Sequence, residues 1–305
     1  MSFPIPRVSI CIPTYNYGRF IGDAIESVLA QTCRDFELII SDNCSDDDTG
    51  SIVQGYLLRD QRVSYHHNRS NLGMTGNWNR CLELARGEYV KILCADDLLA
   101  PTCLERSLEL MAADPRIVLV SSARQYVDEH LQPRTHVSFS SQREFLPGGE
   151  VIRRCLLQGN VIGEPTAVLF RRSLSSRGFS PRYRHIVDLE MWLFLLGKGD
   201  FAHTPEILCS FRQHAAQATG ENILSGRFID DEFLLVDEYC RNPALGLGYW
   251  GWQRARFRKA RLVWNEVTLH PDLTLRKDLQ RHYSLILFAL ISFLALIARP
   301  FRKSR

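Results

Sequence analysis

Residues 89–97 read Tyr-Val-Lys-Ile-Leu-Cys-Ala-Asp-Asp, an apolar run that ends in two adjacent carboxylates. A short apolar run of this kind is typical of a buried strand followed by a loop. Two acidic side chains at the point where a buried strand emerges are costly to place unless they bind a cation. Hard divalent metals prefer such carboxylate oxygens. Asp96 and Asp97 therefore predict a metal site, the plainer alternative being a solvated loop after a strand.

Strand and helix patterns alternate through the first 120 residues. This alternation predicts an α/β fold of the Rossmann-like type, with a mostly parallel sheet flanked by helices. The strand patterns cover residues 8–13, 36–41, 63–66, 88–93 and 117–120, and the helical patterns cover 21–29, 49–58, 77–85 and 101–112.

Polar residues follow three of the predicted strands. Thr14, Tyr15 and Asn16 follow the first, Asp42 the second, and the Asp96–Asp97 pair the fourth. Open α/β sheets bind ligands at the carboxyl ends of their strands, at a switch point in strand order. We therefore expect these residues to gather along one ligand-binding edge of the sheet.

The composition is that of an ordinary globular protein. The chain has 305 residues, 45% of them hydrophobic and 23% charged, which allows one large α/β domain with an appendage or two modest domains. Its nine cysteines include no C-x-x-C pair, which favours reduced thiols in the cytoplasm over a disulfide framework or a zinc site. The amino terminus leads directly into a strand pattern, so no signal peptide is expected.

Charge is divided unevenly along the chain. Residues 1–240 hold 24 Lys and Arg against 31 Asp and Glu, whereas residues 241–305 hold 13 against 3. We expect residues 1–240 to form the catalytic domain, with a ligand-binding half over 1–120 and an acceptor half over 121–240. Residues 241–305 are expected to form a basic helical extension. A basic tail on an acidic body favours a polyanionic partner, either membrane or nucleic acid.

The end of the chain contains an apolar segment between basic flanks. Within Leu285–Ala298 the only polar residue is Ser292. A membrane-spanning helix needs about 20 apolar residues, so this segment is short for a span. We expect a helix that lies in or on an anionic membrane surface, on the cytoplasmic side of the cell membrane. A core helix packed on the catalytic domain, or a true span, are the alternatives.

Six short motifs lie within the first 100 residues. They are Val8–Asn16 (VSICIPTYN), Ser27–Thr32 (SVLAQT), Phe36–Asp46 (FELIISDNCSD), Asn71–Gly73 (NLG), Ala85–Tyr89 (ARGEY) and Asp96–Asp97. Together they resemble the opening of family 2 glycosyltransferases. The resemblance is specific over residues 7–100, moderate over 160–215 and absent over 240–305. It implies the GT-A fold, a nucleotide-sugar donor, with UDP favoured, a Mn²⁺ or Mg²⁺ ion, and inversion at the anomeric centre.

The resemblance assigns the donor nucleotide to two strand ends. Pro13, Thr14, Tyr15 and Asn16 would lie against the nucleobase, and Asp42 would accept a base N–H. Where the family commonly has Asp-Asp-Gly-Ser, residues 42–45 read Asp-Asn-Cys-Ser, which leaves the base open. The plainer reading of Asp42 is a turn-forming aspartate.

The Asp96–Asp97 pair resembles the acidic metal-binding motif of the family. A divalent ion there would bridge the donor diphosphate and stabilise charge on the departing nucleotide. Asp96 would also contact the nucleotide. Many relatives carry a further aspartate at the position of Cys94, so we expect ligation to rest on Asp96 and Asp97.

Two downstream segments complete the resemblance. Val187–Trp192 resembles Glu-Asp-x-Asp-Leu-Trp and makes Asp188 the catalytic base, with Glu190 as the secondary candidate; the plainer reading is an ordinary helix start. Phe211–His214 resembles Tyr-Arg-x-His, so Arg212 and His214 would meet the diphosphate, the alternative being a surface pair.

These observations predict a metal-dependent, inverting glycosyltransferase of the hexosyltransferase type. Its acceptor is expected to be a glycan on a lipid carrier, in bacterial surface polysaccharide biosynthesis. One alternative is a nucleotidyltransferase of similar fold, which should carry a Gly-rich, basic loop after the first strand instead of Pro13–Asn16. The other is a non-enzymatic membrane- or nucleic-acid-binding protein. Such a binding protein would show no metal dependence. For the predicted glycosyltransferase we expect no nucleic-acid partner.

Overall fold

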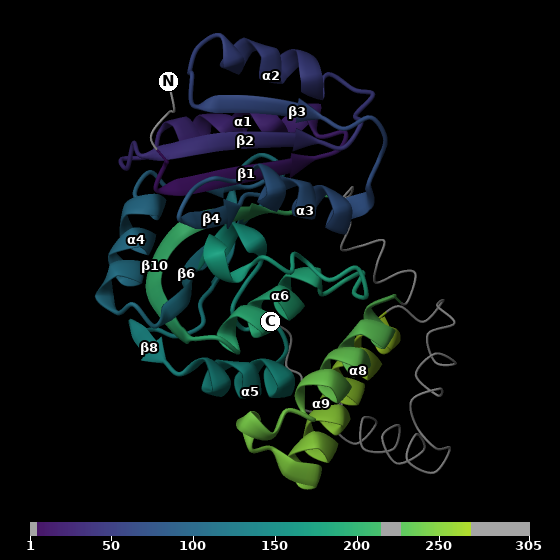
Figure 1. The fold of residues 1–305 in the computed structure, drawn as a ribbon. Helices are drawn as coiled ribbons and strands as arrows, with labels where there is room; N and C mark the ends of the chain where they lie inside the picture. Colours follow the sequence, from purple (N-terminus) through teal and green to yellow (C-terminus); the bar gives the residue numbers. More distant parts are fainter. Residues whose placement is uncertain (1–4, 215–226, 270–305) are drawn as a thin grey trace. The chain divides into compact units, whose positions relative to one another are not determined.

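The computed structural model describes residues 5–214 and 227–269 (Figure 1). By their internal contacts the residues divide into two units. The first comprises Met1–Ile152, Asn160–Arg182 and Val187–His214, and the second comprises Arg153–Gly159, Tyr183–Ile186 and Ala215–Arg305. The domain boundary that we expect near residue 240 stays a prediction.

Four parallel strands form the first half of the sheet, in the order β3-β2-β1-β4. The predicted alternation is confirmed here. The register pairs Thr14 with Asp42, so the ends of β1 and β2 lie side by side. The elements are β1 (Val8–Thr14), α1 (Gly18–Leu29), β2 (Phe36–Asp42), α2 (Thr49–Leu57), β3 (Val63–His67), α3 (Gly73–Leu84) and β4 (Tyr89–Ile92).

The second half of the sheet is mixed. β9 lies antiparallel between β4 and β6, and β6 pairs in parallel with β10. The two-residue strand β5, β7 and β8 add antiparallel pairings. The parallel order that the sequence predicts therefore holds for the first half of the sheet. The remaining elements of the first unit are β5 (Leu98–Leu99), α4 (Cys103–Ala113), β6 (Ile117–Val127), β7 (Pro133–Val137), β8 (Glu144–Leu146), α5 (Gly148–Gln158, continuing into the second unit), η1 (Pro165–Ala167), β9 (Val168–Arg171), η2 (Arg172–Leu174), α6 (Val187–Leu196) and β10 (Asp200–Arg212).

Helices cover both faces of the sheet (Figure 1). Ile10 and Ile12 of β1 point into a core cluster shared with α1 and α4. The alternate residue Cys11 faces the other way, where its thiol donates to the carbonyl of Cys81 in α3. On that same side Phe170 of β9 contacts Trp192 of α6. Because side chains alternate along a strand, strands covered on both faces read as continuous apolar runs.

The described part of the second unit consists mainly of two helices, α8 (Arg227–Tyr239) and α9 (Gly248–Leu269), with η3 (Pro243–Leu245) between them. Asp231 of α8 accepts hydrogen bonds from the backbone N–H groups of Arg184, His185 and Ile186. Among the described residues no helix is long and apolar enough to cross a membrane. The predicted interfacial segment Leu285–Ala298 lies outside the described residues.

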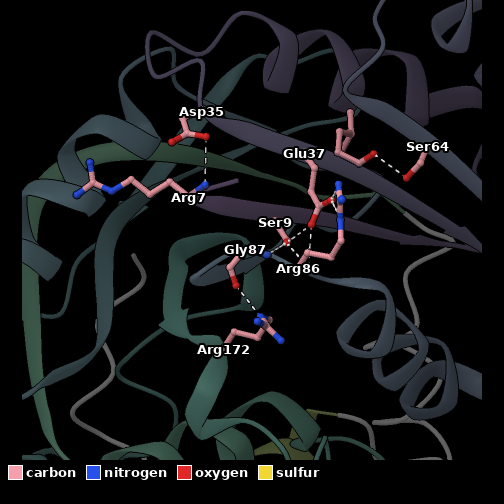
Figure 2. A network of polar contacts seen from close by, with 9 residues as sticks. Arg7, Ser9, Asp35, Glu37, Ser64, Arg86, Gly87 and Arg172 are labelled. Carbon is pink, nitrogen blue, oxygen red and sulfur yellow. Dashed lines mark hydrogen bonds and ion pairs between the residues drawn. The ribbon is translucent and has the colours of Figure 1, made fainter. Parts of the chain in front are cut away.

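A polar network joins the amino ends of the strands (Figure 2). Glu37 of β2 is buried, and its carboxylate accepts hydrogen bonds from Ser9 Oγ (2.6 Å) and from the backbone N–H of Arg86 (2.8 Å). The Arg86 guanidinium completes the pair through Nε (2.9 Å) and Nη2 (2.7 Å). The network therefore ties β1 and β2 to the turn that precedes β4.

Gly87 is required in that turn by close backbone approach. A Cβ atom at this position would lie 2.5 Å from the backbone nitrogen of Ser9, far inside van der Waals contact. The Gly87 N–H donates to Ser9 Oγ (2.8 Å), and its carbonyl accepts from Arg172 Nε (2.6 Å; Figure 2). The Ala-Arg-Gly motif is thus explained by strand assembly.

We predict that Arg86→Ala lowers the free energy of unfolding by about 2 kcal/mol, because it leaves a buried carboxylate short of two hydrogen bonds. Arg80→Ala is the matched control. It breaks the exposed pair with Glu83, which should contribute less than about 0.5 kcal/mol. Urea denaturation measures both. Equal effects of the two substitutions would contradict the role assigned to the network.

None of the nine cysteines, all within the described residues, forms a disulfide.

Candidate active site

Asp97 is a fully buried carboxylate just beyond the end of β4. Oδ2 accepts a hydrogen bond from Thr166 Oγ1 (2.6 Å), and Oδ1 accepts one from the backbone N–H of Arg212 (3.0 Å). Burial raises the pKa of Asp97 well above its usual value, and the charge of Asp96 raises it further. Thr166 in η1 and the end of β10 thereby meet at one strand end.

Asp96 brings a further segment to the same place. His214 Nε2 lies 3.0 Å from Asp96 Oδ2. The His214 ring packs against Phe20, with ring centroids 4.6 Å apart, and against Tyr17 at 5.9 Å. Tyr17 and Phe20 belong to the junction of β1 and α1. His214, which the sequence analysis assigned to the diphosphate, therefore joins the end of β1 to the acidic pair.

These residues fit a divalent cation. The candidate donor atoms of Cys94, Asp96 and Asp97 all lie within 4.8 Å of one another. His214 Nε2 contacts Asp96 Oδ2 and is not a member of this group. Burial, together with the charges of Asp97 and Asp96, raises the pKa of the Cys94 thiol well above its usual value. Carboxylate oxygens are the hard ligands that Mn²⁺ and Mg²⁺ accept, so Asp96 and Asp97 are the principal candidates, as predicted.

Arg212 is held in place by α1. Its side chain is buried, and Nη2 pairs with Asp23 at 2.8 Å. The guanidinium also lies over the ring of Phe20, 4.8 Å from its centroid. The predicted contact between Arg212 and a diphosphate stays a prediction.

The predicted nucleobase residues surround the ends of β1 and β2. Asp42 is buried, and Oδ1 accepts from the backbone N–H (2.9 Å) and the hydroxyl (2.6 Å) of Ser45. Its other oxygen accepts from Tyr65. Burial and this hydrogen bond to Asp42 raise the pKa of Tyr65. Both carboxylate oxygens of Asp42 therefore already accept hydrogen bonds within the protein, as in the turn-forming alternative.

Burial changes from the end of β1 into the loop that follows it. Thr14 is buried and Pro13 half-buried, whereas Tyr15 is 45% exposed. Asn16 adopts a left-handed backbone conformation with φ of 58°. Its N–H donates to Ser45 Oγ at 2.9 Å. Tyr15 is therefore the accessible aromatic residue of this segment, and an exposed ring can stack on a planar base.

Asp188 lies in the first turn of α6, half-buried. Oδ2 accepts a hydrogen bond from Asn160 Nδ2 at 3.3 Å. Burial raises the pKa of Asp188 to about 7, and the charge of Glu164 adds to this effect. A carboxylate with a pKa near neutrality and some accessible surface has the properties of a general base.

Glu190, the secondary candidate, is fully buried in a bidentate ion pair with Arg177, at 2.8 and 2.7 Å. Both oxygens of this buried carboxylate are engaged by the Arg177 guanidinium, so neither is presented to an acceptor hydroxyl. Between the two candidates the geometry favours Asp188.

A segment that the sequence analysis did not single out connects the two acidic centres. Residues 160–166 supply Asn160 to Asp188 and Thr166 to Asp97. Between them, Glu164 pairs with the buried Arg124 and accepts from Tyr126 at 2.8 Å. The sequence marks this segment by Gly163 and by the proline at position 165. In the structure the φ of Gly163 is 126°.

Comparison with known proteins gives the family. The model of glycosyl transferase family 2 matches residues 9–179. The chain belongs to this family. An uncharacterized protein of Mycobacterium tuberculosis (strain CDC 1551 / Oshkosh) is 32% identical over 254 residues, covering 78% of each chain. TuaG from Bacillus subtilis (strain 168), named for glycosyltransfer in teichuronic acid biosynthesis, is 32% identical, covering 68% of this chain and 79% of its own.

Two solved structures share the fold. TarS residues 1–349 from S. aureus, in complex with UDP-GlcNAc, superimpose with a TM-score of 0.64 at 16% identity, covering 86% of this chain and 72% of that one. The mannosyltransferase PcManGT from Pyrobaculum calidifontis, with GDP-Man and Mn²⁺, gives 0.58 at 18% identity, covering 98% and 88%. The expected GT-A fold is thereby confirmed.

The raised pKa of Asp188 has a consequence for stability. A carboxyl whose folded pKa is near 7 instead of about 4 favours the folded state when protonated, so stability falls as pH rises from about 4 to 7. We predict that Asp188→Asn removes this fall and is more stable than wild type at about pH 8 by on the order of 2 kcal/mol. Thermal unfolding at two pH values measures it. A parallel decline of both proteins would contradict the assignment.

Proposed function

We propose that the protein is an inverting, metal-dependent glycosyltransferase that moves a sugar from a nucleotide-sugar donor to a glycan acceptor. The observation that carries the proposal is the connection of two acidic centres by residues 160–166. Asp97 is bound by Thr166 at one end of this segment, and Asp188 by Asn160 at the other. A single-displacement transfer needs a cation that stabilises the leaving group and a carboxylate with a pKa near 7 that takes the proton from the acceptor.

Asp96 and Asp97 would hold Mn²⁺ or Mg²⁺, and His214 would orient the Asp96 carboxylate. The ion, when bound, neutralises the charge that develops on the leaving diphosphate. The protein's own contribution is to keep the two carboxylates in place: Thr166 and the Arg212 backbone orient Asp97, and the His214 ring is packed against Phe20.

Asp188 would take the proton from the acceptor hydroxyl as that oxygen attacks the anomeric carbon. The proton passes to a carboxylate oxygen of Asp188, and the bond to the donor phosphate breaks on the opposite side, which inverts the centre. A pKa of about 7 keeps much of the carboxylate ionised at neutral pH while leaving it basic enough to accept the proton. Asn160 holds one of its oxygens.

UDP-sugars are the favoured donors. The TarS complex with UDP-GlcNAc shares the fold, and the loop after β1 presents Tyr15 for stacking. The PcManGT complex holds GDP-Man, so the fold accepts purine donors as well. In this proposal Pro13, Thr14 and Asn16 shape the base pocket and Asp42 fixes the Ser45 turn beside it.

The acceptor that we propose is a lipid-linked glycan in bacterial surface polysaccharide assembly. TuaG is named for teichuronic acid biosynthesis. A beta-1,3-glucosyltransferase of Campylobacter jejuni named for an undecaprenol-linked acceptor is 37% identical over 106 residues, covering 34% of each chain. Attachment of residues 281–305 to the cytoplasmic face of the membrane would place the enzyme beside such an acceptor.

We predict that Asp188→Asn lowers turnover by about 10²–10⁴, the usual contribution of a general base, with donor affinity unchanged. In the wild type the rate should rise with pH through about 7 because Asp188 must be ionised. Transfer rates and nucleotide titration calorimetry measure the two quantities. Loss of donor binding in the variant would move Asp188 into the nucleotide site.

We predict that Asp96→Asn and Asp97→Asn each abolish most transfer and remove the Mn²⁺ dependence of nucleotide binding. Loss of one carboxylate ligand leaves too few hard donors for a stable site. Asp114→Asn, at an exposed aspartate paired with Arg116, is the matched control for charge. Full activity of either site variant after EDTA treatment would show that no metal acts there.

A further inference from the structure

The two sides of α9 place their cations in different surroundings. On the side that packs against α8, Arg256 pairs with Asp237, and the buried Lys259 pairs with Glu232. The charge of these cations is therefore balanced within the second unit.

The outward side of α9 carries a stripe of exposed aromatic and basic side chains. Successive residues of an α-helix are rotated by roughly 100°, which puts its five members within a sector of roughly the same width. All five are exposed, and they are Trp250, Arg254, Phe257, Arg258 and Arg261. We call this set the α9 stripe. No acidic group of the described residues pairs with its three arginines.

The exposure of the aromatic rings is unusual for a soluble helix. Trp250 is 82% exposed and Phe257 37% exposed. Tyr249, beside the stripe, is 63% exposed, and its ring lies 5.4 Å from that of Trp250. Large exposed rings next to arginines mark a surface that meets another body, and this pairing is typical of helices that lie in a membrane interface.

We propose that the α9 stripe docks on an anionic lipid bilayer. The arginines would contact headgroup phosphates, while Trp250 and Phe257 enter the boundary between headgroups and acyl chains. A flat anionic surface is favoured over a nucleic-acid strand because a single convex helix face meets it with all five side chains at once.

The α9 stripe contains none of the proposed active-site residues, and its test does not depend on transferase activity. The full chain is mixed with vesicles of phosphatidylcholine, with or without phosphatidylglycerol, and the bound fraction is measured by co-sedimentation. We expect binding only to the anionic vesicles, and weakening by salt, because added ions screen the arginines.

Replacement of all three arginines, R254Q/R258Q/R261Q, should weaken binding on the order of 100-fold, since each cation at an anionic surface contributes roughly fivefold. The matched control R59Q/R80Q/R116Q makes the same charge change at exposed positions of the first unit and should bind as wild type. W250A/F257A keeps the charges and should also bind more weakly. Circular dichroism checks the fold of every variant.

The remaining outcomes overturn the proposal. Unchanged binding of both stripe variants would assign membrane attachment to other segments, residues 281–305 above all. Equal losses in the stripe and control variants would indicate a diffuse charge effect. Failure of the wild type to bind anionic vesicles, with binding to single-stranded RNA instead, would make the stripe a nucleic-acid surface.

Discussion

The burial of Asp97 is the constraint on which the site depends. A carboxyl group removed from water is costly to bury unless its oxygens accept hydrogen bonds. Here the bonds come from Thr166 in η1 and from the backbone of Arg212 at the end of β10. These two groups are distant from Asp97 in the sequence, so the requirement of one side chain draws η1 and β10 to the end of β4.

The same requirement connects the cation site with the base. Thr166 is continuous in sequence with Asn160, whose side chain binds Asp188. Gly163 lies between them, and its carbonyl accepts from Trp192 of α6. The helix that carries Asp188 is therefore positioned by the same short segment that satisfies Asp97. A shift of this segment would move both centres together, which keeps the spacing between them fixed.

Sequence patterns were sufficient for the first half of the sheet. Strands such as Val8–Thr14 and Phe36–Asp42 are covered on both faces, and each of their residues but one is buried, so their apolar runs stand out. The antiparallel strand Val168–Arg171 is also largely buried, but it is short and lies among turns. Its sequence therefore shows no hydrophobic period that would predict a strand. The residues of the candidate site also divide into those that the sequence predicts and those that it does not. Acidic residues at strand ends are visible in a sequence, whereas the pairing of Arg212 with Asp23 depends on tertiary contacts alone.

The motifs of the family resemblance contain residues of two kinds, which lie at opposite ends of the parallel strands. At the carboxyl ends lie the groups that we propose for chemistry, such as Asp96. At the amino ends lies the Glu37–Arg86 network, where Gly87 has no room for a side chain (Figure 2). The second group of residues makes no contact that chemistry requires. It fixes the register of β1, β2 and β4, and a fixed register is what aligns the three carboxyl ends. Substitutions at the network should therefore act on activity only through stability, in contrast to substitutions at Asp96, which leave the strand assembly intact.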